Sequence, residues 1–307
     1  MQGLVLKSMG SSYRVRIDTG EILDCVIRGK FRIKGLKLTN PVAVGDMVEV
    51  EVLSVGSSVI TEIHKRKNYI IRKSVNLSKQ YHILASNVDL AVLIATIDKP
   101  VTSFEFIDRF LLTAEAYQIP VLILVNKIDL YGKKEIERLA ELISIYEEVG
   151  YDVKLVSVLK RKNLKAIKEL FKNKITAVFG HSGVGKSSLL NEMVVGYEQI
   201  TAEISEMHQQ GVHTTTFAEM LPLEGGGYVV DTPGIKGLGV VDVEKMELGN
   251  YFPEFVAVKD KCHFNDCVHI NEPKCAVKEA VENEEISPWR YRSYLSMYDD
   301  GAENLYR

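Results

Sequence analysis

The sequence predicts a multidomain protein with an N-terminal β-barrel of the OB-fold type, a central α/β domain and a mostly helical C-terminal domain. Short alternating strands fill the first part of the chain, strands alternate with helices after them, and three cysteines gather between Cys262 and Cys275. Because each of these segments buries its own apolar face, we expect separate cores. The expected domains span residues 1–70, 71–240 and 241–307.

Composition narrows the class of protein. The chain has 307 residues, of which 46% are hydrophobic and 26% charged, as in globular proteins. Its longest apolar run, residues 88–97, is too short to cross a bilayer, and the N-terminus lacks the apolar core of a signal peptide. We therefore expect a cytoplasmic monomer with no membrane partner.

Charge is unevenly distributed along the chain. Residues 1–79 contain 14 Lys and Arg against 7 Asp and Glu, although the whole chain has a net charge of −3. A basic block on an otherwise acidic protein indicates a polyanionic partner for that block.

The basic block also has the pattern of a small barrel. Strands are expected at residues 4–6, 13–17, 22–27, 48–52 and 59–63, with a hairpin turn at 18–21. A barrel of this size is typically an OB-fold, which binds oligonucleotides on one face. We expect RNA contact there, and a solvated basic loop is the alternative. The basic residues that precede the turn Gly45-Asp46 are Arg28, Lys30, Arg32, Lys34 and Lys37.

A basic stretch follows the barrel at residues 64–81, where the pattern of the sequence changes. We interpret it as a linker between domains, either solvated or serving as a second contact strip for RNA. From residue 85 onward, strands at 88–97, 121–125, 153–156 and 175–179 alternate with helices at 104–117, 133–149 and 164–171. This alternation predicts a mostly parallel sheet with helices on both faces.

A phosphate-binding loop follows the last of these strands. Residues 180–187 fit G-x-x-x-x-G-K-[ST], and the residues from Ser188 onward are expected to form the first turns of a helix. The glycines let successive N–H groups point at one phosphate chain, Lys186 is expected on the β- and γ-phosphates, and Ser187 on Mg²⁺. The expected nucleotide-binding residues of the loop are Gly180, His181, Ser182, Gly183, Val184, Gly185, Lys186, Ser187 and Ser188.

The motif Asn126-Lys127-Ile128-Asp129 comes directly after the strand at 121–125. The Asp129 carboxylate can accept from guanine N1–H and its exocyclic amine, a donor pair that adenine lacks. Asn126 can bridge to neighbouring loops, and the stem of Lys127 can lie along the base. Ser157 fits a last guanine-contacting loop. Together with the phosphate loop, the motif predicts a GTP or GDP site.

The motif Asp231-Thr232-Pro233-Gly234 directly follows a predicted strand at 228–230 and fits D-x-x-G, the second switch motif of GTPases. Asp231 is expected to hold Mg²⁺ through water, and the Gly234 N–H to sense the γ-phosphate. A threonine of the polar segment before this strand should complete the Mg²⁺ shell when the γ-phosphate is present. We favour Thr215, with Thr214 and Thr216 left open.

The group that positions the attacking water is not defined by these motifs. Ile235 occupies the position where Ras-type GTPases have a glutamine, and an apolar side chain cannot orient water. His213 is a candidate for this catalytic role, although a structural or RNA-facing histidine fits equally well. We therefore predict slow intrinsic turnover that needs a partner.

The order of the motifs is permuted. Ordinary GTPases begin with the phosphate loop and reach N-K-x-D later, whereas here Asn126 and Ser157 precede Gly180 and the D-x-x-G motif comes last. The chain therefore runs from Gly234 straight into the C-terminal region. We hypothesise that loss of the γ-phosphate tilts that region.

The cysteine cluster has the spacing C-x₄-C-x-H-x₅-C. Three thiolates and one imidazole suit a closed, four-coordinate structural Zn²⁺ site. A domain of this size typically needs such a stabilising centre. The expected ligands are Cys262, Cys267, His269 and Cys275.

In these motifs the chain resembles, over essentially its whole length, the RsgA (YjeQ) family of circularly permuted GTPases. The resemblance implies an OB domain, a GTPase domain and a zinc domain. It also implies binding to the small ribosomal subunit and its rRNA late in subunit maturation, with GTP hydrolysis stimulated by the subunit. Many relatives carry a Trp-His pair where this chain has Val240-Val241, so no role of that histidine carries over.

Two other functions fit the same motifs. The first is a nucleotide-gated RNA-binding assembly factor in which hydrolysis is incidental. The second is a permuted GTPase that acts on the large ribosomal subunit, which the basic barrel and the C-terminal cysteine cluster disfavour.

Overall fold

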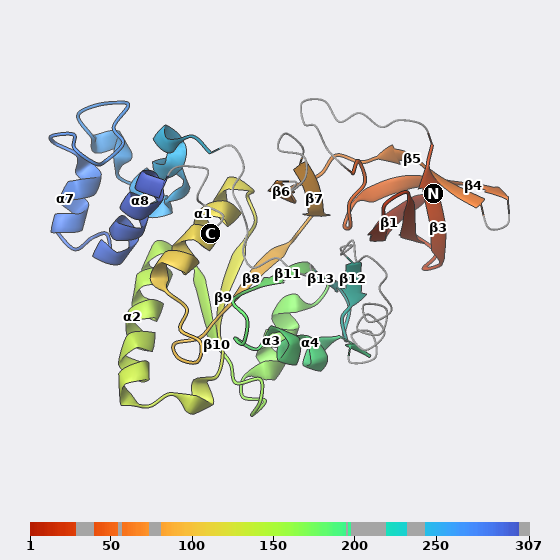
Figure 1. Cartoon of the computed structure of the whole chain (residues 1–307), viewed down its shortest axis with the longest axis horizontal. Helices are drawn as coiled ribbons and strands as arrows, with labels where there is room; N and C mark the ends of the chain where they lie inside the picture. The colour runs from red at the N-terminus through yellow and green to blue at the C-terminus, as the bar shows by residue number, and fades with distance from the viewer. Residues whose placement is uncertain are drawn as a thin grey trace. The chain divides into compact units, whose positions relative to one another are not determined.

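The computed structural model describes residues 1–28, 40–54, 57–73, 81–194, 196–197, 219–231 and 243–300 (Figure 1). The chain forms two compact units. One consists of Met1–Ala91, Leu164–Val178 and Gly185–Ile235, and the other of Val92–Asn163, Phe179–Val184 and Lys236–Arg307. Among the described residues, no helix has the length and apolar character needed to cross a membrane.

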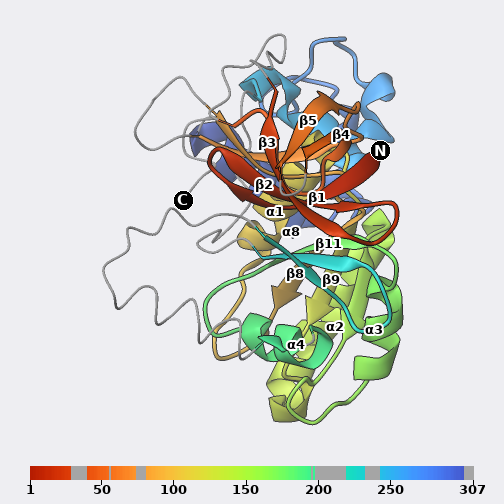
Figure 2. The same cartoon turned by 90° about the vertical axis from the view of Figure 1, so that its right-hand side faces the viewer.

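Five strands close into the N-terminal barrel of the first unit (Figures 1 and 2). β1 pairs with both β2 and β4, β2 with β3, β3 with β5 in parallel, and β5 with β4. This order confirms the OB-type barrel. Alternation sets its core, because Tyr13, Val15 and Ile17 point inward on β2. The strands are β1 (Gln2–Met9), β2 (Ser12–Ile17), β3 (Ile22–Ile27), β4 (Met47–Ser54) and β5 (Ser57–Ile63).

The basic stretch after the barrel is not simply a solvated linker. β6 (Tyr69–Lys73) pairs antiparallel with β7 (Tyr81–Ser86). Ahead of this hairpin, the Arg66 guanidinium is 10% exposed and binds the fully buried Asp46 carboxylate at 2.6 Å. Ser86 Oγ donates to the same carboxylate at 2.6 Å. Arg66 therefore fastens the barrel to the hairpin, a role that the local charge pattern did not indicate.

Gly45 lies in the turn before β4, beside this ion pair. Its φ is +87°, and a Cβ there would lie 2.1 Å from the backbone oxygen of Ser86. Only glycine fits so close an approach. Of the predicted basic cluster, Arg28 pairs with Glu51 at 2.6 Å. Lys30, Arg32, Lys34 and Lys37 lie outside the described residues.

The first unit also contains strands that follow the barrel by more than a hundred residues. β11 (Ile175–Phe179) runs parallel to β13 (Tyr228–Asp231), and β12 (Glu219–Pro222) pairs antiparallel with β13. Helices α3 (Leu164–Phe171) and α4 (Lys186–Met193) belong to this unit. We did not predict β12, which is only four residues long.

The second unit contains β10, β9 and the part of β8 from Val92 onward, and these strands neighbour one another in the order β10-β9-β8. All six residues of β8 (Leu90–Ala95) are buried, and β9 (Val121–Val125) runs parallel to β10 (Asp152–Leu155). Helix α1 (Phe104–Ala116) starts at Ser103, whose Oγ accepts from the Phe106 N–H at 3.2 Å. Helix α2 (Lys133–Val149) ends at Gly150 in the left-handed conformation. These elements confirm the predicted α/β pattern.

The C-terminal region of the second unit is mostly helical, as predicted. Its core contains Phe252, Phe255, Tyr294 and Met297, and it includes Leu112 of α1. The region therefore packs directly on that helix. Its elements are η2 (Lys245–Tyr251), α6 (Pro253–Val256), η3 (Lys259–Lys261), α7 (Ala276–Glu282) and α8 (Pro288–Asp300).

Candidate nucleotide site and metal centre

The phosphate loop has the backbone that its glycines predict. Gly180 has a φ of +141°, and a Cβ on it would lie 2.5 Å from the backbone oxygen of Ile94 in β8. Gly183 and Gly185 also have positive φ values, of 85° and 104°. Left-handed backbone at these three positions turns the chain sharply before α4. Such a turn is the local structure that a phosphate chain requires.

Helix α4 begins at Lys186, immediately after Gly185. Burial lowers the pKa of the Lys186 ammonium, because its positive charge is partly removed from water. A phosphate beside it would restore the preference for the charged form. Ser187 and Ser188 are exposed in the first turn of the helix, where hydroxyl and backbone N–H groups remain available to an anion.

Asn126 connects three segments in the second unit. Its Nδ2 donates to the Val184 carbonyl in the phosphate loop at 2.9 Å, and its Oδ1 accepts from the Val158 N–H at 3.1 Å. The side chain is only 3% exposed. The side-chain amide of Asn126 therefore connects its own N-K-x-D motif to the phosphate loop and to the loop after β10.

Asp129, which is predicted to contact the guanine base, is accessible beside Asn126. Lys127 adopts left-handed backbone, and its ammonium donates to the Lys99 carbonyl. Asp129 is exposed in the short helix η1 (Ile128–Leu130). Ser157 is fully buried, and its Oγ accepts from the Lys160 N–H at 3.1 Å. The hydroxyl of Ser157 thus stabilises its own turn.

Two residues at this site were not foreseen from the sequence. The Tyr131 hydroxyl donates to the Asn126 carbonyl at 2.5 Å and accepts from the Ile97 N–H at 3.0 Å. The Phe106 ring of α1 lies on the His181 ring of the phosphate loop, with centroids 3.9 Å apart. No motif predicts either contact, because both depend on how α1 and the loops fold together.

Several predicted site residues cannot be placed. His213, Thr214, Thr215, Thr216 and Gly234 lie outside the described residues. Asp231 is described only as the backbone end of β13. Their roles in catalysis and magnesium binding stay predictions.

The four predicted zinc ligands come together. One ligand atom from each of Cys262, Cys267, His269 and Cys275 lies within 4.8 Å of the others. His269 presents Nδ1, which lies 3.7 Å from Cys262 Sγ and 3.4 Å from Cys275 Sγ. Ligand atoms on a tetrahedral Zn²⁺ with bonds of about 2.0–2.3 Å have similar separations. The donor set therefore fits one zinc ion.

The pKa shifts of His269 and Cys267 act in opposite directions on metal binding. Burial lowers the pKa of His269, which keeps the imidazole neutral, the form that binds metals. Burial raises the pKa of the Cys267 thiol to about 12. A thiol of that kind becomes a thiolate only beside a positive charge, and a bound metal supplies one.

The loop that carries His269 is held by its neighbours. The Glu272 carboxylate accepts from the N–H groups of Val268, Ile270 and Asn271 at 2.9, 2.9 and 3.1 Å. Although burial opposes its ionisation, these donors lower the pKa of Glu272. The Tyr291 hydroxyl donates to the His269 carbonyl at 2.7 Å. Such supports fix the direction of metal ligands.

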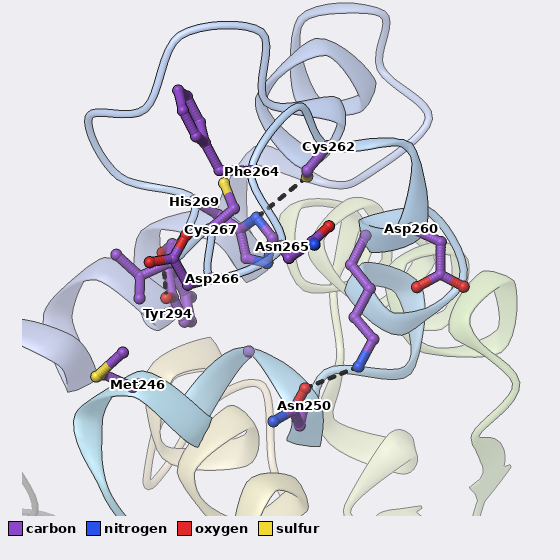
Figure 3. A pocket seen from close by; sticks show the side chains of 13 residues that line it. Met246, Asn250, Asp260, Cys262, Phe264, Asn265, Asp266, Cys267, His269 and Tyr294 are labelled. Carbon is purple, nitrogen blue, oxygen red and sulfur yellow. Dashed lines mark hydrogen bonds between the residues drawn. The ribbon is translucent and has the colours of Figure 1, made fainter.

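A cavity of about 440 Å³ lies between this loop and η2 (Figure 3). Cys262, Cys267 and His269 form part of its wall, so the cavity borders the candidate metal centre. Lys259 Nζ donates to Asn250 Oδ1 across its edge at 2.9 Å, and Phe264 is 41% exposed beside it.

A phosphate loop that follows its N-K-x-D motif, in a chain that opens with an OB-type barrel, defines a circularly permuted GTPase. The RsgA GTPase family model matches residues 63–241, and the RsgA N-terminal domain model matches residues 2–60. The chain belongs to the RsgA GTPase family. It is therefore a GTP hydrolase whose family implies GTP or GDP and Mg²⁺ as ligands.

Relatives resemble the chain along its whole length. The Bacteroides fragilis protein named small ribosomal subunit biogenesis GTPase RsgA is 52% identical and covers 100% of this chain and 99% of its own. The Flavobacterium psychrophilum protein of that name is 50% identical, with coverage of 100% and 95%.

Two solved structures have a similar fold. YjeQ from Thermotoga maritima superposes with a TM-score of 0.79 at 37% identity and covers 97% of both chains. YloQ, described as a circularly permuted GTPase, gives a TM-score of 0.76 at 32% identity, with coverage of 97% and 94%.

Proposed function

We propose that this protein binds the small ribosomal subunit late in its maturation, contacts rRNA through the barrel and the zinc-binding region, and hydrolyses GTP when the subunit stimulates it. The observation that carries the nucleotide part is the double hydrogen bond of Asn126 to Val184 and Val158. The names of the relatives support the ribosomal part. The basic charge of residues 1–79 supports rRNA as the contact.

In this proposal each side chain of the nucleotide site has one task. Asp129 accepts from guanine N1–H and the exocyclic amine, while Asn126 holds the loops around the base. Lys186 and the N–H groups of the phosphate loop stabilise the charge that develops on the γ-phosphate. The Gly234 N–H senses that phosphate. His213 is the candidate for positioning the attacking water.

Mg²⁺ neutralises charge on the β- and γ-phosphate oxygens when bound. We assign Ser187, Thr215 and Asp231 as the residues that hold it, the last through water. One structural Zn²⁺ is held by the Cys262, Cys267, His269 and Cys275 side chains. The protein acts as a cytoplasmic monomer.

The proposal is tested by measuring GTP turnover of the full chain alone, with purified small subunits and with large subunits. We expect slow turnover alone, strong stimulation by small subunits and none by large ones. Lys186→Ala should abolish stimulated turnover. Stimulation by large subunits, or fast turnover that small subunits do not change, would contradict it.

Co-sedimentation separates the proposal from a purely nucleotide-gated binding factor. The full chain is pelleted with small subunits in the presence of GDP or of a non-hydrolysable GTP analogue. Binding that depends on the nucleotide, without any stimulated turnover, would favour the gated factor. Equal affinity of the free protein for ATP and GTP would show that the N-K-x-D motif does not select guanine.

A further inference from the structure

Strand β1 joins the barrel to the strands that carry the second switch motif. Lys7 of β1 pairs with Glu219 of β12, and Glu219 pairs on its other side with Asp231 at the end of β13. Lys7 Nζ also donates to Glu219 Oε2 at 2.7 Å. A barrel residue, a residue of β12 and the first residue of the D-x-x-G motif thus stand in one row, on strands that are labelled in Figure 1.

Glu219 lies close, in sequence and in the sheet, to both predicted switch motifs. Thr216 comes only three residues earlier, so β12 directly follows the segment that contains Thr215. At the same end, β12 pairs with Asp231. β12 is therefore connected to both segments that, in the proposed function, respond to the γ-phosphate. A change at Asp231 can therefore reach Glu219 through the pairing of β12 with β13.

β1 uses different residues for closing the barrel and for contacting β12. Gln2, Gly3 and Leu4 pair with β4, and the register of β1 against β2 shifts between Val5 and Lys7. Such a bulge redirects a strand. Because Lys7 lies beyond it, the contact with β12 can be lost while β1 and β4 stay paired.

The joint itself is weak enough to be reversible. In the part of the chain that the structure describes, Lys7 and Glu219 are the single residue pair that joins β1 to β12, and their side chains are 27% and 26% exposed. Partly exposed ion pairs change equilibria by about two- to fivefold. An ion pair of this strength can form in one nucleotide state and break in the other.

A second barrel contact lies at the opposite end of these strands. The Arg16 guanidinium of β2 lies 5.2 Å from the centroid of the Tyr228 ring. Tyr228 begins β13 and pairs with Pro222, away from Asp231. Arg16 therefore anchors the barrel without reaching the switch end, which makes it a matched control.

We propose that Glu219 is a positioning residue that transmits the nucleotide state to the barrel through Lys7. A bound GTP, acting through Asp231 at the end of β13, holds β12 where Glu219 meets Lys7, and GDP loosens this joint. Coupling of this kind is reciprocal, so RNA bound to the barrel changes the affinity for GTP by the same factor. The inference rests on the proposed function and gives the subunit a path by which to stimulate hydrolysis.

Amide hydrogen exchange of β1 in the full chain tests the coupling without any ribosomal partner. With Mg²⁺ and a non-hydrolysable GTP analogue, we expect β1 amides to exchange about two- to fivefold more slowly than with GDP. Lys7→Gln and Glu219→Gln should remove this difference. The double exchange of Lys7→Glu with Glu219→Lys should restore part of it, and Arg16→Gln should leave it unchanged.

Affinity for a fluorescent GDP analogue and circular dichroism establish that each variant is folded. If Glu219→Gln fails to fold, Lys7→Gln carries the test, because Lys7 lies beyond the residues that pair β1 with β4. A wild-type β1 that exchanges equally in both states, or a difference that persists in the variants, overturns the coupling. If the exchange difference holds but small subunits do not stimulate hydrolysis, the coupling stands and the proposed function fails.

Discussion

Arg290 of α8 donates from Nη1 to Asp108 Oδ1 of α1 at 2.7 Å, and the two side chains are 1% and 0% exposed. Arg290 also binds Glu254 at 2.7 Å. Although burial opposes a charge, the two carboxylates keep the pKa of Arg290 well above its ordinary value. The C-terminal region is thus held to α1 by a buried ion pair. Any tilt of this region after loss of the γ-phosphate must therefore move α1 or break the pair.

Replacing Arg290 by methionine should destabilise the docking of this region. The substitution leaves the Asp108 charge buried without its partner, which typically costs about 3–5 kcal/mol. Urea unfolding followed by Trp289 fluorescence measures the effect. Trp289 is the single tryptophan of the chain. The centroids of the Trp289 and Phe104 rings are 5.4 Å apart, and Trp289 Nε1 donates to Glu141 Oε1 of α2 at 2.7 Å.

Lys154→Gln is the matched control for this experiment. Lys154 pairs with Asp152 at 3.3 Å, but the two side chains are 44% and 74% exposed. Surface pairs of this kind contribute about 0–1 kcal/mol. Equal losses of stability in Arg290→Met and Lys154→Gln would show that the buried pair does not hold the region.

Asn126→Ala should weaken binding of a fluorescent GDP analogue by at least about tenfold. The truncation leaves the Val184 carbonyl and the Val158 N–H without their shared partner, and each unsatisfied buried group costs about 1–3 kcal/mol. Asn126→Asp keeps an acceptor for Val158 but turns a carboxylate oxygen toward the Val184 carbonyl. It should therefore bind no better than the alanine variant.

Ser144→Ala provides the comparison for Asn126. Ser144 lies exposed on α2, where its Oγ donates to Glu148, and its loss should not change nucleotide affinity. If Asn126→Ala binds the analogue as tightly as the wild type, the amide does not organise the site.

Removal of zinc should unfold the C-terminal loop that carries the ligands. We expect one zinc ion per chain, released by a strong chelator and absent from Cys275→Ser, because a structural zinc site contributes directly to folding. A metal assay together with Trp289 fluorescence measures both effects. Full zinc content in Cys275→Ser would show that the proposed ligand set is wrong.

Cys25 offers an internal control for that experiment. It is buried in the barrel, and burial raises the pKa of its thiol to about 11. The reactive thiolate is therefore scarce at neutral pH. Cys25→Ala should keep its zinc, and an alkylating reagent should leave Cys25 unmodified in the folded protein. Rapid alkylation of Cys25 would contradict the barrel packing.

Glu272→Gln should lower zinc affinity by about ten- to a hundredfold without removing a ligand. A neutral amide accepts less strongly from the three N–H groups that Glu272 holds, and outer-shell changes of this kind have effects of that size. Competition with a chromophoric chelator measures the affinity. Glu282→Gln on the exposed side of α7 should have no effect, and an equal loss in both variants would exclude a specific role.

Local patterns predicted most elements and the grouping of the four candidate zinc ligands. The five barrel strands, the helices α1 and α2 and the four cysteine and histidine residues each have a strong period or a fixed spacing, which is why the sequence alone predicts them. β12 and the β6–β7 hairpin were missed or misread because short strands have no distinctive period of their own. They become strands through pairing with distant partners.

The amino-acid sequence alone determined the chemistry of this protein, since a phosphate loop, a guanine motif and a zinc knuckle each require particular residue types at close spacing. Only the tertiary structure decided which distant residues meet. Asp46 with Arg66, Phe106 with His181, Asp108 with Arg290 and Lys7 with Glu219 are pairs that no local spacing encodes. Contacts of this kind depend on how packed elements bring separate parts of the chain together.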